Sequence, residues 1–442
     1  MLAKLHARLG DFWWYSLMIF CACRLGDLMN AFVGLWLVPK YVDPSELGAV
    51  APLTQFAGFL AIPVAAFANT FRNELSHLSI GREFGKLKTL LRGVFIATAI
   101  FLFVAIVVAR FVLPAFLERI RIVEGSLGIV IIASSFVGAV APIYTNALQA
   151  LKKFKAQSVL NLVGAPIRLL VMLVAMPFRA LTGYFVGQSA TPMFNIVASA
   201  FSLRKELSVK AEPYWKNDFI RRFSKLFSIF AIIGAVDGFY LLVEATVIRQ
   251  RLPDLDSAGY YMATRFSEIS TFLAATLSFT IFSFAAEKAA KGEDTRPLVV
   301  KSLIANACFC LILALPFLFF GKTLLSLLPH GDQYSTYWWA VPWLIGITYL
   351  VSTVGIFITA EFSANRFAFL KWYLPLELLY PILLLLVTGH GYLAGIIPSS
   401  WTEFLTTHNI YSLNTMLLWV TAINAIKTTI CIIAMLLKRS AQ

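Results

Sequence analysis

Nine ionisable side chains lie inside long apolar stretches of this sequence, where a charge is costly. A charged group at the centre of a bilayer costs about 2.5–3.5 kcal/mol on insertion scales, so such residues are typical of polar pathways or binding sites. Seven of them are the candidate substrate-binding residues: Arg24, Asp27, Arg168, Asp237, Glu244, Arg265 and Glu268. Together they predict a membrane bundle that encloses a polar interior.

The spacing of two pairs predicts direct contact. Arg24 and Asp27 are three residues apart, as are Arg265 and Glu268, so each pair lies on one helix face. A guanidinium group forms forked, charge-assisted hydrogen bonds to phosphate oxygens. The carboxylates would set the resting charge and bind protons or a cation, since burial raises a carboxylate pKa. The alternative reading is that these pairs only fix helix register.

The remaining inner charges leave more alternatives open. Arg168 either lines a polar lobe or anchors a kinked helix after a proline. Glu244 lies near the end of its stretch, where it could reach the interface beside Arg249. Glu377 and Lys427 are expected to pair with each other as a structural bridge.

The apolar stretches themselves predict the fold class. Of 442 residues, 59% are hydrophobic and 14% charged, and stretches of about 20 apolar residues recur from end to end. We predict an all-α membrane protein with twelve transmembrane helices, at residues 13–38, 48–71, 91–113, 127–149, 158–178, 181–201, 227–247, 259–284, 299–320, 338–360, 367–387 and 413–437.

Basic residues predict the orientation of these spans. Lys and Arg are roughly threefold more frequent in alternate connections, on the side that holds both termini, and this bias marks the cytoplasmic side. The net charge of +14 therefore reflects topology, and nucleic acid is not an expected partner.

A weak internal repeat predicts two halves. Gly48 and Gly259 each open the second span of a half, and the same separation relates Gly81 to Gly292 in the basic loops that follow. Halves of six spans run in the same direction, with a central cavity between them. We expect an N-terminal six-helix lobe (1–205), a cytoplasmic linker (206–226) and a C-terminal six-helix lobe (227–442).

Motifs for catalysis are missing from the sequence. It contains no Gly-rich phosphate loop and no metal-ligand spacing, and its connections are short. We therefore expect no enzyme activity and no cofactor.

The architecture resembles that of the multidrug/oligosaccharidyl-lipid/polysaccharide (MOP) exporter superfamily. The stretch Leu37-Val-Pro-Lys-Tyr-Val-Asp-Pro-Ser-Glu-Leu-Gly48 is similar to the turn after the first helix in its polysaccharide, or O-antigen, flippase branch. The segment from Phe71-Arg72 to Gly81-Arg82 also resembles that branch. Two further spans, found in fourteen-helix relatives, are not present.

The resemblance implies a flippase that moves an isoprenoid-pyrophosphate-linked oligosaccharide across the bacterial inner membrane by alternating access. Arginines in helices one and eight of such flippases are associated with the pyrophosphate, and Arg24 and Arg265 fall in those helices. Coupling to H+ or Na+, contact with membrane lipids, and partnership with a polysaccharide polymerase and glycosyltransferases are expected. The alternatives are a multidrug cation antiporter of the same superfamily, favoured by Asp237 and Glu244, and a structural membrane protein without transport activity.

Overall fold

The structure is a computed structural model that describes residues 24–80, 83–122, 127–151, 153–214, 217–290, 293–363, 369–387, 400 and 412–437. Its regular elements are all helical, and no strand occurs within these ranges, which confirms the predicted all-α class. In chain order the elements are η1 (Val33–Leu37), α2 (Val38–Tyr41), α3 (Pro44–Leu47), α4 (Val50–Ile80), α5 (Phe84–Arg119), α6 (Leu127–Ala150), α7 (Phe154–Ala175), α8 (Ala180–Ser202), η2 (Glu206–Ser208), α9 (Asn217–Arg251), α10 (Asp254–Ala290), α11 (Arg296–Ser326), α12 (Gly331–Tyr334), η3 (Ser335–Tyr337), α13 (Ala340–Ser363), α14 (Leu370–Val387) and α16 (Leu413–Leu437).

Eight segments of the described chain are long and apolar enough to cross a membrane. They are Pro44–Ala68, Phe84–Arg119, Leu127–Leu148, Lys155–Ala175, Phe223–Arg251, Arg296–Ser326, Ala340–Glu361 and Leu413–Ile433. The long helices α8, α10 and α14 cover three further predicted spans, and the first predicted span begins outside the described residues. Such a chain has the character of a multi-pass membrane protein, while the count of twelve spans stays a prediction.

The chain divides into two compact units. Unit 1 comprises Met1–Val33 and Leu53–Gly238, and unit 2 comprises Gly34–Pro52 and Phe239–Gln442. Both boundaries around the short segment 34–52 and the boundary in α9 fall inside helical stretches. The predicted division into two six-helix lobes (1–205 and 227–442) and a linker (206–226) stays a prediction.

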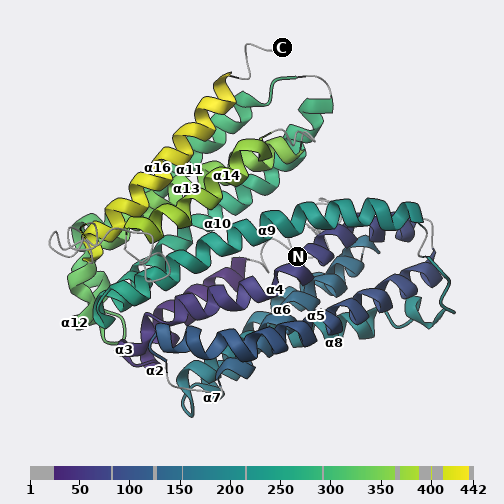
Figure 1. Ribbon diagram of the computed structural model, residues 1–442, viewed down its shortest axis with the longest axis horizontal. Coiled ribbons are helices and arrows are strands. Elements are labelled where there is room, and N and C mark those ends of the chain that lie inside the picture. The colour runs from purple at the N-terminus through teal and green to yellow at the C-terminus, as the bar shows by residue number, and fades with distance from the viewer. Residues whose placement is uncertain are drawn as a thin grey trace, which may run out of the picture. The chain divides into compact units, whose positions relative to one another are not determined.

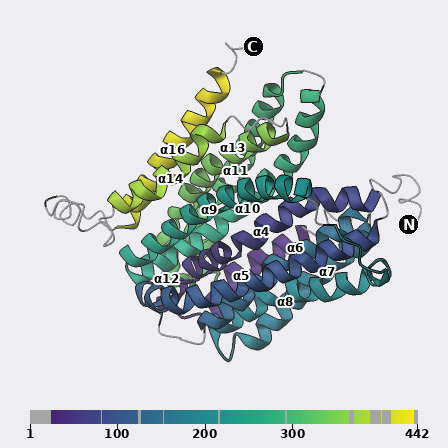
Figure 2. The ribbon, with the colours of Figure 1, turned by 45° about the vertical axis from the view of Figure 1, so that its right-hand side comes forward.

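Helix packing in unit 1 is closest between α7 and α8 and between α6 and α8, which lie side by side in Figures 1 and 2. Aromatic rings join other helices of this unit. Phe56 of α4 stacks on Phe116 of α5 with ring centroids 4.6 Å apart, and Phe67 of α4 contacts Phe223 of α9 at 4.9 Å. Gly238 of α9 lies against Ile62 of α4. A Cβ at position 238 would lie 2.6 Å from Cδ1 of Ile62, so the glycine leaves room for this side chain.

Unit 2 has an apolar core formed by the last turns of α9 together with α10, α11, α13, α14 and α16. Its fully buried members include Leu252, Val341, Leu384, Leu417 and Val420. Helices α13, α14 and α16 lie next to one another in both ribbon views, and α16 contacts both of the others. The buried Tyr240, Tyr260 and Tyr380 of this core are described with the charged residues below.

The segment 34–52 packs on α10 within unit 2. Asp43 caps the short helix α3 by accepting hydrogen bonds from the backbone N–H (2.8 Å) and hydroxyl (2.6 Å) of Ser45. Gly48 then approaches α10 so closely that a Cβ would lie 2.1 Å from the Ser257 hydroxyl oxygen. Its counterpart in the predicted repeat, Gly259, faces the ring of Tyr337, which a Cβ would meet at 2.5 Å. Both glycines of this repeat pair therefore serve close helix contacts, while Gly81 and Gly292 lie outside the described residues.

Candidate functional site

The predicted pairing of Arg24 and Asp27 is present in unit 1. Arg24 Nη1 lies 2.9 Å from Asp27 Oδ2, and the two side chains are 30% and 29% exposed. Both residues stand one turn apart on the helical stretch that leads into η1. The guanidinium is therefore held by a carboxylate of its own helix.

Two further candidates belong to unit 1. Arg168 of α7 is partly buried, and among the described residues its Nε has no hydrogen-bond acceptor. Tyr184 of α8 is its ionisable neighbour. Asp237, on α9, is partly buried and lies one residue before the boundary of the unit.

Arg265 and Glu268 form the matching pair in unit 2. Arg265 Nη2 lies 2.8 Å from Glu268 Oε1, and the guanidinium stands over the ring of buried Tyr261 at 4.9 Å. The stem of Arg265 runs across Gly34, where a Cβ would meet its Cδ at 2.8 Å. Gly34 belongs to the π-helical turn η1, a type of irregularity that is frequent at functional sites. This contact fixes the position of the arginine from its aliphatic side.

Glu244 of α9 is partly buried and is hydrogen-bonded to two tyrosines of unit 2. It accepts a hydrogen bond of 2.9 Å from the hydroxyl of Tyr260 at Oε1, and a second from the hydroxyl of Tyr380 at Oε2. Tyr260 and Tyr380 are both buried. Two phenol donors can stabilise an ionised carboxylate inside an apolar core.

The predicted bridge between Glu377 and Lys427 is confirmed, and it joins the same network. Lys427 Nζ lies 2.9 Å from Glu377 Oε1, and both side chains are 5% exposed. The ammonium also stands 4.9 Å from the ring centroid of Tyr240 and 6.0 Å from that of Tyr380. Tyr380 thus contacts both Glu244 and Lys427. The network therefore brings together two carboxyl groups, one ammonium group and three tyrosines.

The sequence signal for this network was incomplete. The acids and the lysine were identified by their charge inside apolar stretches, but the tyrosines were not. Tyr240 lies one helical turn before Glu244 and Tyr380 one turn after Glu377, so helical spacing could have found them.

Arg249 has a structural role that the sequence analysis did not identify. It is 1% exposed and is among the largest fully buried side chains of the described chain. Its Nη1 donates to Asp254 Oδ1 at 2.9 Å and to the Ser257 hydroxyl at 3.0 Å, and its Nη2 donates to the Ser45 carbonyl at 2.8 Å. It joins α9, α10 and the segment 34–52 in unit 2.

The seven candidates fall into two groups. Unit 1 holds Arg24, Asp27, Arg168 and Asp237, and unit 2 holds Glu244, Arg265 and Glu268. In unit 2, Tyr260 is close enough to feel the charges of both Glu244 and Arg265. A central cavity shared by the two groups stays a prediction. Within the described residues, no group of three His, Cys, Asp or Glu side chains is arranged to hold a metal ion.

Solved structures, rather than sequences, provide the relatives of this chain. The sequence matches no protein-family model and no curated protein. The fold is similar to that of an inward-facing multidrug resistance transporter of the MATE family, MOP superfamily, with a TM-score of 0.68 and 12% identity over 94% of this chain and 95% of the other. The lipid II flippase MurJ in an inward closed conformation gives a TM-score of 0.62 and 14% identity over 95% and 87%. A variant of the Vibrio cholerae MATE transporter VcmN gives 0.62 and 12% over 100% and 98%. The chain therefore has the fold of MOP-superfamily transporters along nearly its whole length.

Proposed function

We propose that this protein is a MOP-type flippase that moves a lipid carrying a pyrophosphate-linked oligosaccharide across the cytoplasmic membrane by alternating access. The fold supports transport, because the similar structures are all described as transporters or as a flippase. Both termini would face the cytoplasm. A polysaccharide polymerase and glycosyltransferases would act on the same oligosaccharide as partners.

The observation that carries the choice of an anionic substrate is the pair of similar arginine sites, one in each unit. Arg24 and Arg265 each contact one carboxylate a single turn further along the helix, at 2.9 Å and 2.8 Å. Their side chains keep 30% and 20% exposure. A guanidinium offers N–H donors in a planar fork that matches the oxygens of a phosphate as well as those of a carboxylate.

The paired carboxylates give the sites a way to release the substrate. A pyrophosphate that binds Arg24 or Arg265 competes with Asp27 or Glu268 for the same N–H donors. Each carboxylate then neutralises its arginine when the substrate leaves, so the empty site does not hold an uncompensated charge. Substrate exchange at each arginine is a swap of one anion for another.

The coupling ion in this proposal is a proton, held in the network around Glu244. Lys427 already neutralises Glu377 at 2.9 Å, and a metal cation at that position would be repelled by the ammonium. The carboxyl of Glu244 instead accepts hydrogen bonds from the phenols of Tyr260 and Tyr380. Protonation of Glu244 would remove the net negative charge of the network and alter its bonds to Tyr260 and Tyr380.

A multidrug cation antiporter is the second candidate, and the fold supports it to a comparable degree. The carboxylates weigh against it. Glu244 is engaged by two tyrosines, Glu377 by Lys427, and Asp27 and Glu268 by arginines. A drug cation that bound any of these four carboxylates would have to displace its present partner. A structural membrane protein without transport would need no such accessible arginines.

Proteoliposomes test the two transport candidates against each other. The full chain is reconstituted either with a fluorescent polyprenyl-pyrophosphate oligosaccharide or with ethidium and an imposed proton gradient. We expect protein-dependent movement of the lipid between leaflets and none of ethidium. Ethidium efflux without lipid movement would overturn the flippase proposal in favour of the antiporter, and movement of neither would favour the structural reading.

A further inference from the structure

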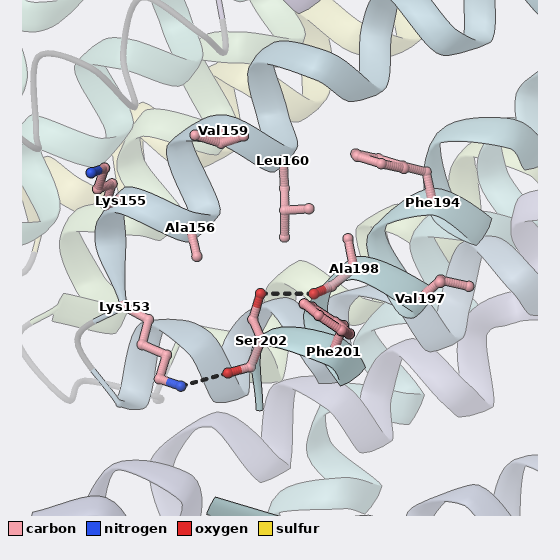
Figure 3. Close-up of a pocket in the computed structure, with 10 residues that line it drawn as sticks. All are labelled: Lys153, Lys155, Ala156, Val159, Leu160, Phe194, Val197, Ala198, Phe201 and Ser202. Carbon is pink, nitrogen blue, oxygen red and sulfur yellow. Dashed lines mark hydrogen bonds between the residues drawn. The ribbon is translucent and has the colours of Figure 1, made fainter. Parts of the chain in front are cut away.

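A surface pocket in unit 1 has no role in the proposed transport of the substrate, and its lining combines apolar and basic residues. It has a volume of about 830 Å³ and lies between the first turns of α7 and the last turns of α8. Figure 3 shows Val159, Leu160, Phe194, Val197 and Phe201 around an open space. Val159, Val197 and Phe201 are 45%, 61% and 64% exposed, so the pocket opens on the outer surface of these helices.

The interior of the pocket offers no uncommitted hydrogen-bonding side chain. Its one hydroxyl, that of Ser202, donates to the Ala198 carbonyl at 2.8 Å. Lys153 donates to the Ser202 carbonyl at 2.6 Å and lies 2.7 Å from a carboxylate oxygen of Glu206. A sugar or other polar group inside would lose its hydrogen bonds to water without replacement. The part of a ligand that enters must therefore be apolar.

Two positively charged side chains beside the pocket favour an anionic ligand. Lys155, in the first turn of α7, is exposed and makes no hydrogen bond or ion pair within the described part of the chain. Arg204 follows the end of α8, and its guanidinium stands 4.3 Å from the centroid of the Phe201 ring that lines the pocket. Neither cation contacts a carboxylate of the described residues.

Lys153 differs from Lys155 and Arg204, because its charge is neutralised by Glu206. Burial raises the pKa of Glu206, but its hydrogen bond from Lys153 and the charges of Lys153 and Lys205 outweigh burial and leave that pKa lowered. The Glu206 carboxylate thus stays ionised and neutralises Lys153 rather than Lys155. Two positive charges remain beside an apolar groove.

We infer that the α7–α8 pocket binds an anionic phospholipid, with an acyl chain between Leu160, Phe194 and Phe201 and the phosphate beside Lys155 and Arg204. These cations lie on the side predicted to be cytoplasmic, where anionic lipids give the membrane surface its negative potential. The groove excludes a sugar, and the cations favour an anionic over a zwitterionic head group. This inference does not depend on which substrate the protein moves.

Native mass spectrometry of the full-length protein in mild detergent measures the binding. Phosphatidylglycerol and phosphatidylcholine with identical acyl chains are titrated onto the wild type and onto Lys155→Gln, Ala198→Leu and Lys301→Gln. Lys301 is an exposed lysine near the start of α11 in unit 2, and serves as the matched control. Thermal unfolding checks that each variant is folded, and Ala156→Leu replaces Ala198→Leu if the latter is not.

The expected pattern separates the head group from the chain. Lys155→Gln weakens the binding of phosphatidylglycerol by about fivefold, because one cation near the anionic head group is lost. The affinity for phosphatidylcholine stays unchanged. Ala198→Leu fills the groove and lowers the affinity for both lipids, and Lys301→Gln lowers the affinity for neither.

Three results would overturn the inference. One is unchanged phosphatidylglycerol affinity in both Lys155→Gln and the double variant Lys155→Gln/Arg204→Gln. Another is competition by glycerol phosphate as strong as by phosphatidylglycerol, which would leave a phosphate site without a chain. The third is that a polyprenyl pyrophosphate displaces phosphatidylglycerol at a lower concentration than phosphatidylglycerol itself needs to bind, and that Lys155→Gln and Ala198→Leu abolish this displacement. That result would make the pocket a substrate site.

Discussion

Arg249 Nη2 donates a hydrogen bond of 2.8 Å to the backbone carbonyl of Ser45, 204 residues earlier in the chain. The same guanidinium holds Asp254 and Ser257 of α10, so one buried side chain fastens the segment 34–52 to unit 2. This segment contains the π-helical turn whose Gly34 supports Arg265. The fastening by Arg249 and the position of a candidate substrate arginine therefore depend on the same short stretch.

Replacement of Arg249 tests that fastening. Arg249→Ala removes charge-assisted hydrogen bonds from a fully buried position, and we expect a loss of about 1.5–3 kcal/mol in the free energy of unfolding. Thermal unfolding in detergent measures it. Arg110→Ala, at an exposed position of α5, is the control and should leave the melting temperature unchanged. Equal effects of the two substitutions would contradict the assignment.

Gly48 and Gly58 form a matched pair of glycines near and within α4. A Cβ at Gly48 would lie 2.1 Å from Ser257 Oγ and 3.0 Å from its backbone carbonyl carbon, whereas a Cβ at Gly58 would meet nothing within 4 Å. Gly48→Ala should destabilise by about 1–3 kcal/mol through overpacking. Gly58→Ala should be neutral or stabilise by up to about 1 kcal/mol, because alanine favours the helix. Unfolding curves that rank the variants in the opposite order would refute the close contact.

The pair Lys427 and Glu377 predicts non-additive substitution effects. Lys427→Met leaves the buried Glu377 without its cation and should destabilise by about 3–5 kcal/mol. In the double variant Lys427→Met/Glu377→Gln neither member of the pair carries a charge, so we expect most of that loss to be recovered. A double-mutant cycle from chemical unfolding gives the coupling free energy. Additive effects would mean that the two groups do not interact.

Asp43 predicts an acid-dependent contribution to stability. Hydrogen bonds from the side chain and then the backbone N–H of Ser45 lower the pKa of Asp43, with a smaller opposing effect of burial. A lowered pKa in the folded state stabilises the fold above the unfolded pKa of about 3.9, and this contribution is lost as pH falls through the folded pKa. The difference in melting temperature between wild type and Asp43→Asn should therefore shrink on acidification from neutral pH. A difference that grows towards low pH would contradict the direction of the shift.

The fold class and the paired charges were within reach of the sequence. Apolar stretches and the three-residue spacing of Arg24 with Asp27 and of Arg265 with Glu268 depend on local helix geometry, which sequence encodes directly. The bridge between Glu377 and Lys427 followed from the cost of leaving either charge alone in an apolar environment.

Other features depend on contacts between distant residues and could not be predicted in this way. The burial of Arg249 depends on its packing against α10 and against the segment 34–52, which lies about 200 residues earlier in the chain. The hydrogen bonds that Tyr260 and Tyr380 donate to Glu244 join α10 and α14 to α9, and no spacing along one helix predicts such contacts between helices. The α7–α8 pocket depends on how these two helices pack together, which apolar composition does not specify.

The most direct test of the central claim compares Arg24→Ala, Arg265→Ala and Arg265→Lys with wild type in proteoliposomes that contain a fluorescent polyprenyl-pyrophosphate oligosaccharide. The account predicts that both alanine variants insert normally but move the lipid at least about tenfold more slowly, since each loses a forked contact to the pyrophosphate. Arg265→Lys should recover part of the rate, because the charge remains and the fork does not. Wild-type rates in both alanine variants would contradict the account.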